Sequence, residues 1–264
     1  MIYFLGDVHG NFDHILPVLL ADDPKDAHPK TVIFLGDIEA QRPFEDEIRP
    51  LVEAGVAVWF IHGNHDTDSR ANWDNLLPSW HLNLHGRVVE IDGLRIAGLG
   101  GTFREKIWLS PAPPMFHAYQ YFEEDLWRRS LPNQAREQYL LRYSSAIFPD
   151  TYDALARQHA DILVTHEAPS CHPHGFEAID LLAQGMGVQT LFHGHQHDSL
   201  NYRAWDAHLR FRAHGVGFCG IMDMHGGYLL VGDFDEARRY RQKHPRADIE
   251  QGYRKKRASE AKDN

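Results

Sequence analysis

The stretch Ile2–Gly10, which reads IYFLGDVHG, sets the fold of this 264-residue chain. Its four apolar residues, the length of a short buried strand, run directly into a glycine-containing turn that carries an acid and a histidine. Thr31–Leu35 and Val56–Ile61 repeat the pattern, and they are followed by Gly36-Asp37 and by Gly63-Asn64-His65-Asp66. The repetition predicts three buried strands, each ending at a polar turn.

Helices are expected between these strands. Residues 12–20 and 44–54 have apolar residues at helical spacing, although Pro17 indicates that the first helix starts late or is kinked. Because strand–helix–strand order favours parallel pairing with right-handed crossovers, we expect a parallel sheet in this half of the chain. Ligands of such sheets gather beyond the carboxyl ends of the strands, which is where the polar turns lie.

The second half of the chain predicts a second group of strands. Arg87–Ile91 and Leu94–Leu99, joined by Asp92-Gly93, have the pattern of a hairpin. Further strands are predicted at 161–164, 188–192, 209–213, 216–219 and 228–231. Two sheets packed face to face, with helices outside, account for this pattern.

Residues 102–150 interrupt the strand pattern with a segment rich in aromatic residues and arginines. Prolines predict a loop in its first part, and 117–130 and 133–143 are predicted helices. One interpretation is a lid over a ligand site that stacks on a base or another planar group. The alternative is a helical hairpin that buries its aromatic side chains against the sheet.

Composition favours a soluble globular protein, since 43% of the residues are hydrophobic and no apolar stretch approaches the roughly 20 residues that span a bilayer. The first residues carry neither a basic segment nor a cleavage-site pattern, so we expect no signal peptide. Cys171 and Cys219 cannot make a disulfide framework. A cytoplasmic location is therefore the simpler expectation, and no membrane partner is predicted.

The formal charge of −10 is distributed unevenly. Residues 236–264 hold ten Lys and Arg against five acids, which leaves a net charge of −15 on the rest of the chain. Such an acidic body is not suited to binding a long nucleic acid through its phosphates. We expect a single domain over 1–235 that contains the 102–150 insertion, followed by a basic, flexible tail at 236–264.

Five short motifs supply side chains of the kinds that bind metal ions, namely Asp7, His9, Asp37, Asn64, His166, His195 and His197. Asp7 and His9 stand two apart, so on an extended strand end they would point to the same side. Asp37 can bridge two cations because a carboxylate has two oxygens. Oxygen and nitrogen donors without thiolate favour Mn, Fe, Zn, Co or Ni. The motifs therefore predict a centre for two divalent metal ions, with Mn the expected activator.

His65 lies beside Asn64 and is left over from metal binding. Two cations about 3.5–4 Å apart would generate a hydroxide that attacks phosphorus and would clamp the phosphoryl oxygens. His65 is then the natural group to protonate the leaving oxygen or to stabilise charge on the phosphoryl group. Asp66 is expected either to orient His65 or to cap the segment that follows.

Together, the motifs resemble those of the calcineurin-like metallophosphoesterase superfamily. The shared set is Gly-Asp-x-His, Gly-Asp, Gly-Asn-His-Asp, His and Gly-His-x-His, from residue 6 to residue 197, and the Leu99-Gly100-Gly101 turn is also similar. The resemblance implies an α/β fold, a four-layer α/β/β/α sandwich of two mixed sheets with a dinuclear centre. It assigns one ion to Asp7, His9, Asp37 and His197, the other to Asp37, Asn64, His166 and His195, and the family's catalytic histidine position to His65.

One departure from the family bears on the substrate. The protein Ser/Thr phosphatase branch continues its Gly-Asp motif with an acid and an arginine, where this chain has Ala40 and Gln41. We therefore expect a metal-dependent phosphoric ester hydrolase whose substrate is a small phosphodiester or nucleotide. The alternatives are a phosphomonoesterase resembling protein phosphatases, and a degenerate, non-catalytic scaffold that only binds metal.

Overall fold

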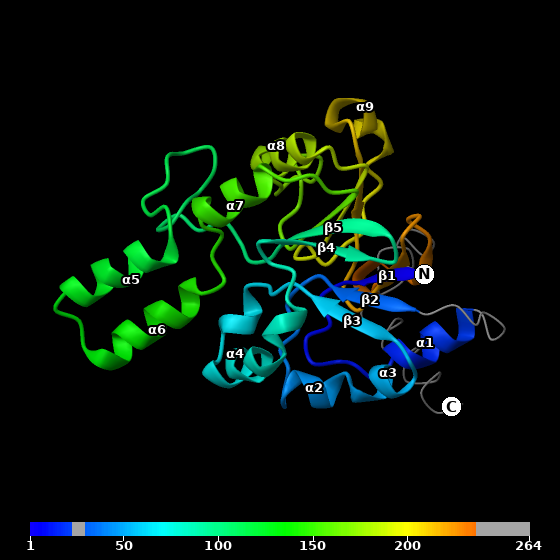
Figure 1. The fold of residues 1–264 in the computed structure, drawn as a ribbon, viewed down its shortest axis with the longest axis horizontal. Helices are drawn as coiled ribbons and strands as arrows, with labels where there is room; N and C mark the ends of the chain where they lie inside the picture. The colour runs from blue at the N-terminus through cyan, green and yellow to red at the C-terminus, as the bar shows by residue number, and fades with distance from the viewer. Residues whose placement is uncertain (23–29, 236–264) are drawn as a thin grey trace, which may run out of the picture.

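The computed structural model describes residues 1–22 and 30–235, so the predicted basic tail at 236–264 lies outside the described residues. Within them, the strands form two five-stranded sheets that lie face to face (Figure 1). The first sheet has the order β10-β9-β1-β2-β3, with bounds β1 Ile2–Leu5, β2 Thr31–Phe34, β3 Ala57–Phe60, β9 Ile221–Asp223 and β10 Tyr228–Leu230. Its β1, β2 and β3 pair in parallel, whereas β9 and β10 are antiparallel to their neighbours.

The second sheet has the order β4-β5-β6-β7-β8, with bounds β4 Arg87–Ile91, β5 Leu94–Leu99, β6 Ile162–Thr165, β7 Thr190–His193 and β8 Arg212–Gly215. Strands β5 to β8 are parallel, and β4 pairs with β5 as the predicted hairpin. Its turn residues Asp92 and Gly93 have φ of 51° and 78°, the left-handed values that a tight two-residue hairpin turn requires. Both sheets are thus mixed.

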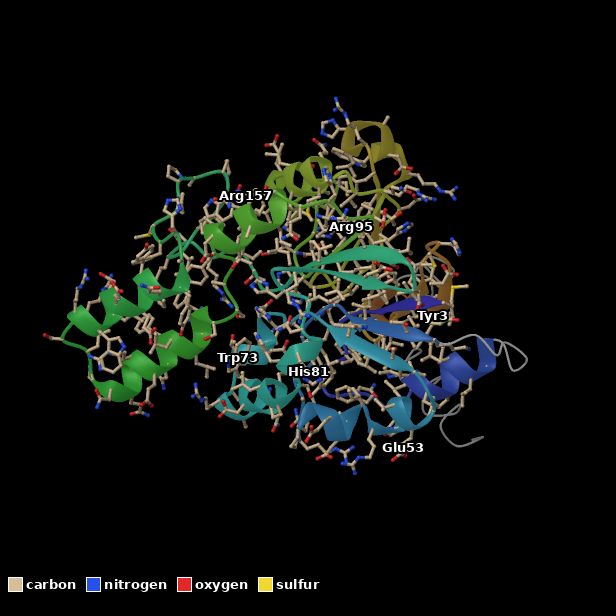
Figure 2. All side chains as sticks on the ribbon, viewed as in Figure 1. Tyr3, Glu53, Trp73, His81, Arg95 and Arg157 are labelled. Carbon is tan, nitrogen blue, oxygen red and sulfur yellow. The ribbon has the colours of Figure 1, made fainter. Side chains whose placement is uncertain are left out.

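Side chains alternate between the two faces of each strand and so build separate cores. On β1, Ile2 and Phe4 point into the layer between the sheets, whereas Tyr3 and Leu5 face the outer helices. The rings of Phe4 and Phe192 stack across the two sheets, with centroids 3.7 Å apart. The side chains in Figure 2 fill the space between the sheets and beneath the helices.

Helices cover the outer faces of both sheets. The first sheet packs against α1 Ile15–Asp22, α2 Phe44–Glu47, α3 Arg49–Glu53 and α4 Arg70–Leu76. The second packs against α7 Pro149–Ala156, α8 Glu177–Met186 and α9 Asp206–Leu209. Short 3₁₀ helices are η1 His65–Thr67, η2 Leu77–Leu82 and η3 Arg203–Trp205. The predicted four-layer α/β/β/α sandwich is therefore confirmed.

The two predicted helices of the first half are shorter than expected. Helix α1 begins at Ile15, which places Pro17 in the first turn, where a missing amide costs no helical hydrogen bond. The helix predicted at 44–54 is two helices that meet at Ile48, and Pro50 opens the second. Proline thus sets both helix starts.

Of the strands predicted in the second half, one starts later than predicted and one is wrong. Leu209 ends helix α9, and the strand predicted at 209–213 begins only at Arg212. No strand forms at 216–219, because the chain turns there: Cys219 has φ of 55° and the amide of Gly220 donates to the carbonyl of Gly217. The next strand begins at Ile221.

Residues 102–150 contain the predicted helices as α5 Tyr119–Arg128 and α6 Asn133–Tyr143. The two helices form a hairpin that extends away from the sheets (Figure 1). The alternative in which its aromatic residues pack against the sheet holds only for Phe103 and Trp108, which join the core of the second sheet, whereas Phe122, Tyr143 and Phe148 belong to a separate small cluster. Only the base of the segment joins the sandwich, where Thr102 pairs with Ala146. None of the helices in the described part of the chain is long and apolar enough to cross a membrane.

Candidate metal centre

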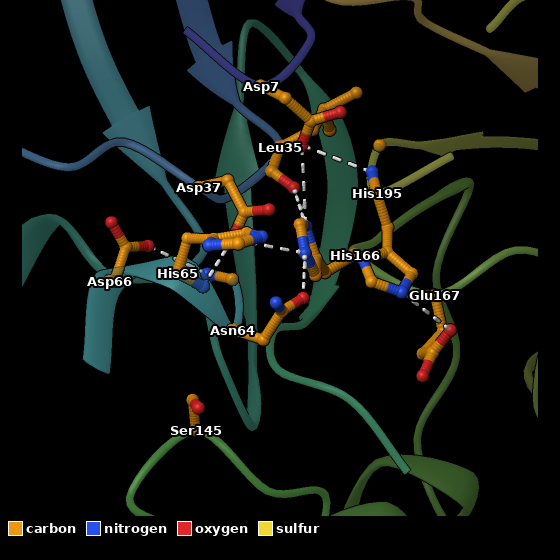
Figure 3. A network of polar contacts seen from close by, with 12 residues as sticks. Asp7, Leu35, Asp37, Asn64, His65, Asp66, Ser145, His166, Glu167 and His195 are labelled. Carbon is orange, nitrogen blue, oxygen red and sulfur yellow. Dashed lines mark hydrogen bonds and ion pairs between the residues drawn. The ribbon is translucent and has the colours of Figure 1, made fainter. Parts of the chain in front are cut away.

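All the predicted metal-binding side chains follow strand ends and meet at one edge of the sandwich. Asp7, Asp37 and Asn64 follow β1, β2 and β3 of the first sheet. His166 follows β6 of the second sheet, and His195 follows β7. Because the carboxyl ends of parallel strands lie at the same edge of a sheet, the two sheets together present these side chains to one another (Figure 3).

The first cluster contains His9, Asp37 and His197. The Nε2 atoms of His9 and His197 lie 3.2 Å apart, and Asp37 Oδ2 lies 3.9 Å from His9 Nε2. The other ring nitrogen of His9 contacts Glu39 Oε2 at 3.0 Å, which fixes the ring so that Nε2 faces the cluster. Two imidazole nitrogens and a carboxylate oxygen that converge in this way could hold a divalent cation.

The second cluster contains Asp37, His166 and His195. His166 Nδ1 donates to the carbonyl of Leu35 at 2.8 Å, so Nε2 is the ring nitrogen left for the cluster. That Nε2 lies 3.4 Å from Asp37 Oδ1 and 3.1 Å from Asn64 Oδ1. Asp37 therefore belongs to both clusters, as a carboxylate that bridges two ions would.

Two buried carboxylate oxygens without hydrogen-bond partners in the described part of the chain indicate whether these residues fit a metal ion. Asp7 and Asp37 are both fully buried, and the Oδ2 atom of each has no hydrogen-bond partner among the described residues. Asp7 Oδ1, in contrast, accepts from the backbone amide of His195 at 3.1 Å. Buried polar atoms nearly always have a partner, and a cation supplies one for an acceptor that no donor reaches. The donor set therefore fits a pair of divalent ions.

The electrostatics of the cluster favour positive charge. Burial lowers the pKa of His166, but the carboxylates of Asp37 and Asp7 outweigh burial and raise that pKa to about 10. Burial raises the pKa of Asp37, yet His166 holds it below its usual range. For His195 burial prevails, and with the nearby His166 it lowers the pKa to about 3. The carboxylates thus stabilise a cation at this point, and His195 stays neutral, as a ligand must be.

Tight turns, and not extended strand ends, bring the ligands together. Strand β1 ends at Leu5, and His9 has φ of 44°, so the prediction that Asp7 and His9 point to the same side of an extended strand end is wrong. Asp37, His195 and His197 also have positive φ, of 47°, 65° and 55°. Such conformations are costly for residues with side chains and tend to cluster at functional sites.

A glycine makes room for the shared carboxylate. A Cβ atom at Gly63 would lie 2.2 Å from Asp37 Oδ1 and 2.6 Å from His166 Cε1. The Gly63-Asn64-His65 turn therefore passes close to Asp37 only because it starts with glycine. This approach also lets the amide of His65 donate to Asp37 Oδ1 at 2.8 Å.

His65 lies at the edge of the cluster and remains partly exposed. Its ring is 5.2 Å from that of His9, centroid to centroid, and its Nδ1 contacts Asp68 Oδ2 at 2.6 Å. Burial lowers the pKa of His65, but the carboxylates of Asp37 and Asp68 outweigh burial and raise it. His65 therefore lies beside the proposed metal ligands, and Asp68 contacts its Nδ1 but not its Nε2.

Asp66 takes neither of its two predicted roles, which were to orient His65 and to cap the segment that follows. It is fully buried, and its two oxygens accept from the backbone amides of Gly63 at 2.8 Å and Glu39 at 2.7 Å. The carboxylate that contacts His65 is that of Asp68, one helical turn further on. Asp66 thus joins the turn after β3 to the turn after β2. It holds two backbone amides in place, whereas we expected it to orient His65 or to cap the segment that follows.

Sequence reasoning missed three acids that support the cluster. Glu39 contacts His9, Asp68 contacts His65, and Glu167 Oε2 lies 3.9 Å from His195 Nε2. Glu167 is buried, which raises its pKa to about 7. Each acid lies within three residues of a motif residue in the sequence, and that proximity is the signal that could have found them.

The sequence profile of the calcineurin-like phosphoesterase family matches residues 1–199. An uncharacterized protein from Haemophilus influenzae (strain ATCC 51907 / DSM 11121 / KW20 / Rd) is 42% identical over 237 residues, which cover 87% of this chain and 96% of the relative.

Solved structures resemble the chain more distantly. The crystal structure of TT1561 of Thermus thermophilus aligns with a TM-score of 0.47 at 13% identity, over 84% of this chain and 94% of the other. A 5′-nucleotidase precursor from the same organism aligns with a TM-score of 0.30 at 16% identity, over 90% of this chain and 53% of the other. The family profile spans every motif of the strand-end cluster, and the chain therefore belongs to the calcineurin-like phosphoesterase family.

Proposed function

We propose that this protein hydrolyses a small phosphodiester or nucleotide with two divalent metal ions bound at the strand-end cluster. Membership of the family supports metal-dependent hydrolysis of a phosphate ester. The proposed ligands of one ion are Asp7, His9, Asp37 and His197, and those of the other are Asp37, Asn64, His166 and His195.

One observation carries the proposal. Of the three side-chain clusters that could hold a cation, the two formed around buried Asp37 share that residue, and its Oδ2 is buried without a hydrogen-bond partner among the described residues; the third cluster is Glu39, His65 and Asp68. A scaffold that had lost metal binding would need no such buried acceptor, because leaving it unsatisfied costs on the order of 1–3 kcal/mol. The donor set therefore favours a protein that binds metal, and hydrolysis is what separates the enzyme from a scaffold that only binds metal.

Divalent ions bound here would act as Lewis acids toward the phosphoryl oxygens and make a strong nucleophile available at neutral pH. The side chains and backbone amides of the protein provide the positioning. The histidines and carboxylates fix the positions of the reacting groups, since their rings and oxygens are held by Leu35, Glu39 and backbone amides. This fixed arrangement avoids reorganisation during the reaction.

His65 is the proposed proton donor to the leaving oxygen. It belongs to neither of the two clusters that share Asp37, yet its ring lies next to that of His9. Asp68 holds the Nδ1 side of the ring, so Nε2 is the nitrogen that can face a substrate. Asp68 is therefore a positioning residue in this proposal, and His65 is the catalytic residue.

The first experiment compares hydrolysis of bis-p-nitrophenyl phosphate and p-nitrophenyl phosphate with added Mn, with Asp37→Asn as the inactive control. We expect the diester to be hydrolysed faster and both activities to vanish in the variant. A preference for the monoester would replace the proposal by a phosphomonoesterase. Failure of the wild-type protein to hydrolyse either compound while it binds Mn would support the non-catalytic scaffold.

A further inference from the structure

A pocket lies within the 102–150 insertion, between the turn at 103–106 and helix α6. It has a volume of about 630 Å³, and its lining residues are Phe103, Arg104, Glu105, Lys106, Ala135, Gln138, Tyr139, Arg142 and Tyr143. Three of these residues are cationic and one is acidic, although the chain as a whole carries a net charge of −10. The pocket is thus a basic site on an acidic protein.

The cationic side chains that line the pocket form no ion pair with a carboxylate of the described residues. Within the described part of the chain, no carboxylate lies within 4.0 Å of the charged groups of Arg104, Lys106 or Arg142. By contrast, Arg128 and Arg129 on α5 both pair with acids one turn earlier. Cations gathered around a pocket without partners favour an anionic ligand.

Arg104 carries the clearest sign of a missing ligand. Its Nε is buried and has no hydrogen-bond partner among the described residues. Burial and the nearby charge of Arg142 both lower its pKa, so the positive charges repel each other. A phosphate bound in the pocket would offset this repulsion, because a guanidinium matches phosphate oxygens in geometry and charge.

The same turn connects the pocket to the metal centre. The amide of Phe103, next to Arg104, donates to Glu167 Oε1 at 3.0 Å, and the other oxygen of Glu167 faces His195. The charge of Arg104 acts on Glu167 and on Asp68, which holds His65. On the α6 side, Ser145 bonds to Thr67 of η1 at 2.8 Å, and Figure 3 shows Ser145 across from Asn64 and His65. Two contacts thus join the segment that carries the pocket to the residues around the metal centre.

We propose that this pocket binds a second phosphate group of the substrate, which makes the preferred substrate a phosphate ester with at least two phosphoryl groups. The inference rests on the proposed function, since it places the scissile phosphate at the metal centre. Arg104 is the inner contact for the second phosphate, and Lys106 and Arg142 are the contacts at the exposed rim. Lys106 also lies 5.2 Å from the centre of the Tyr139 ring, which holds the ammonium over the pocket.

The test is a binding measurement that needs no turnover. Adenosine 5′-monophosphate, adenosine 5′-diphosphate and adenosine 3′,5′-bisphosphate are titrated into the Mn-loaded protein by calorimetry. The wild type should bind at least one of the doubly phosphorylated compounds roughly ten-fold more tightly than the monophosphate, because hydrogen bonds between a cationic side chain and a phosphate are stronger than neutral ones. The double variant Lys106→Gln/Arg142→Gln should lose most of that difference while its thermal unfolding stays unchanged, because neither side chain is buried.

The control is Arg128→Gln, which removes an exposed cation from α5 outside the pocket. It should bind all three compounds like the wild type. Equal affinity of the wild type for all three compounds, or an advantage that survives in the double variant, would overturn the second-phosphate site. Turnover of p-nitrophenyl esters tests the proposed function separately, so an active enzyme without the affinity difference would contradict the pocket alone.

Discussion

The strand-end cluster and the α5–α6 hairpin are built in opposite ways. The cluster takes side chains from both sheets and rests on the continuous core between them, and its central acids are fully buried. The hairpin has only its own small core and leaves Tyr121 and Trp127 exposed. Rigid support is what a metal centre requires, whereas a peripheral hairpin can change without disturbing it. The difference suggests that the reaction is set by the sandwich and the substrate by the insertion.

Metal removal should give the largest difference in response between the strand-end cluster and the α5–α6 hairpin. Chelation should abolish hydrolysis, and re-addition of Mn should raise the unfolding temperature, because a ligand that binds only the folded state stabilises it. In hydrogen exchange, the amides around Asp7, Asp37 and His166 should gain protection with Mn, whereas α5 and α6 should change little. Equal changes in both regions would show that the hairpin and the metal centre respond as one unit.

His65→Ala should remove chemistry and spare metal binding. We expect kcat to fall roughly 10²–10⁴-fold, the usual contribution of a general acid, while the protein keeps its two ions. The loss should be larger for esters with poor leaving groups than for p-nitrophenyl esters, since a poor leaving group depends more on protonation. Metal content is measured in the purified variant, and loss of an ion would show that His65 is a ligand.

Paired core substitutions compare the stability of the two regions. Phe192→Ala removes a ring that stacks on Phe4 between the sheets, and it should cost about 3–5 kcal/mol of the free energy of unfolding. Phe122→Ala removes a ring from the hairpin's own cluster. It should loosen α5 and α6 locally and leave the main unfolding transition almost unchanged. If both variants lowered the main transition equally, the hairpin would belong to the cooperative core.

Much of the fold could be predicted because its signals are local. Apolar runs such as 2–5 and 31–34 end at polar turns, and Asp92-Gly93 is a strong hairpin signal. The failures also have local causes. The run at 216–219 looks like a strand, but Gly217 and Gly220 close a local turn there, which strand propensity does not reveal.

The site was predictable to the extent that its residues sit in motifs. Asp37 and His166 follow strands in recognisable patterns, and the structure brings them together. The roles of Asp68 and Glu39 could not be assigned from the sequence. Asp68 reaches His65 only because a helical turn follows His65, and the position of Glu39 depends on its left-handed conformation after Asp37. Arg104 was even less predictable, since only the folded insertion shows that Arg142 faces the same pocket.

Asp68→Asn tests the smallest of these effects, the support that one exposed acid gives to His65, the proposed catalytic histidine. The amide can keep a contact with His65 Nδ1 but loses the charge, so we expect kcat to fall about ten-fold with KM and metal content unchanged. The loss should again grow with poorer leaving groups, which a structural defect would not produce. Asp74→Asn is the matched control, because Asp74 is an exposed acid nearby in sequence that pairs with Arg70 instead. If Asp68→Asn behaved like this control, His65 would be positioned by the turn after β3 alone, and the chemistry would depend still more completely on the sandwich.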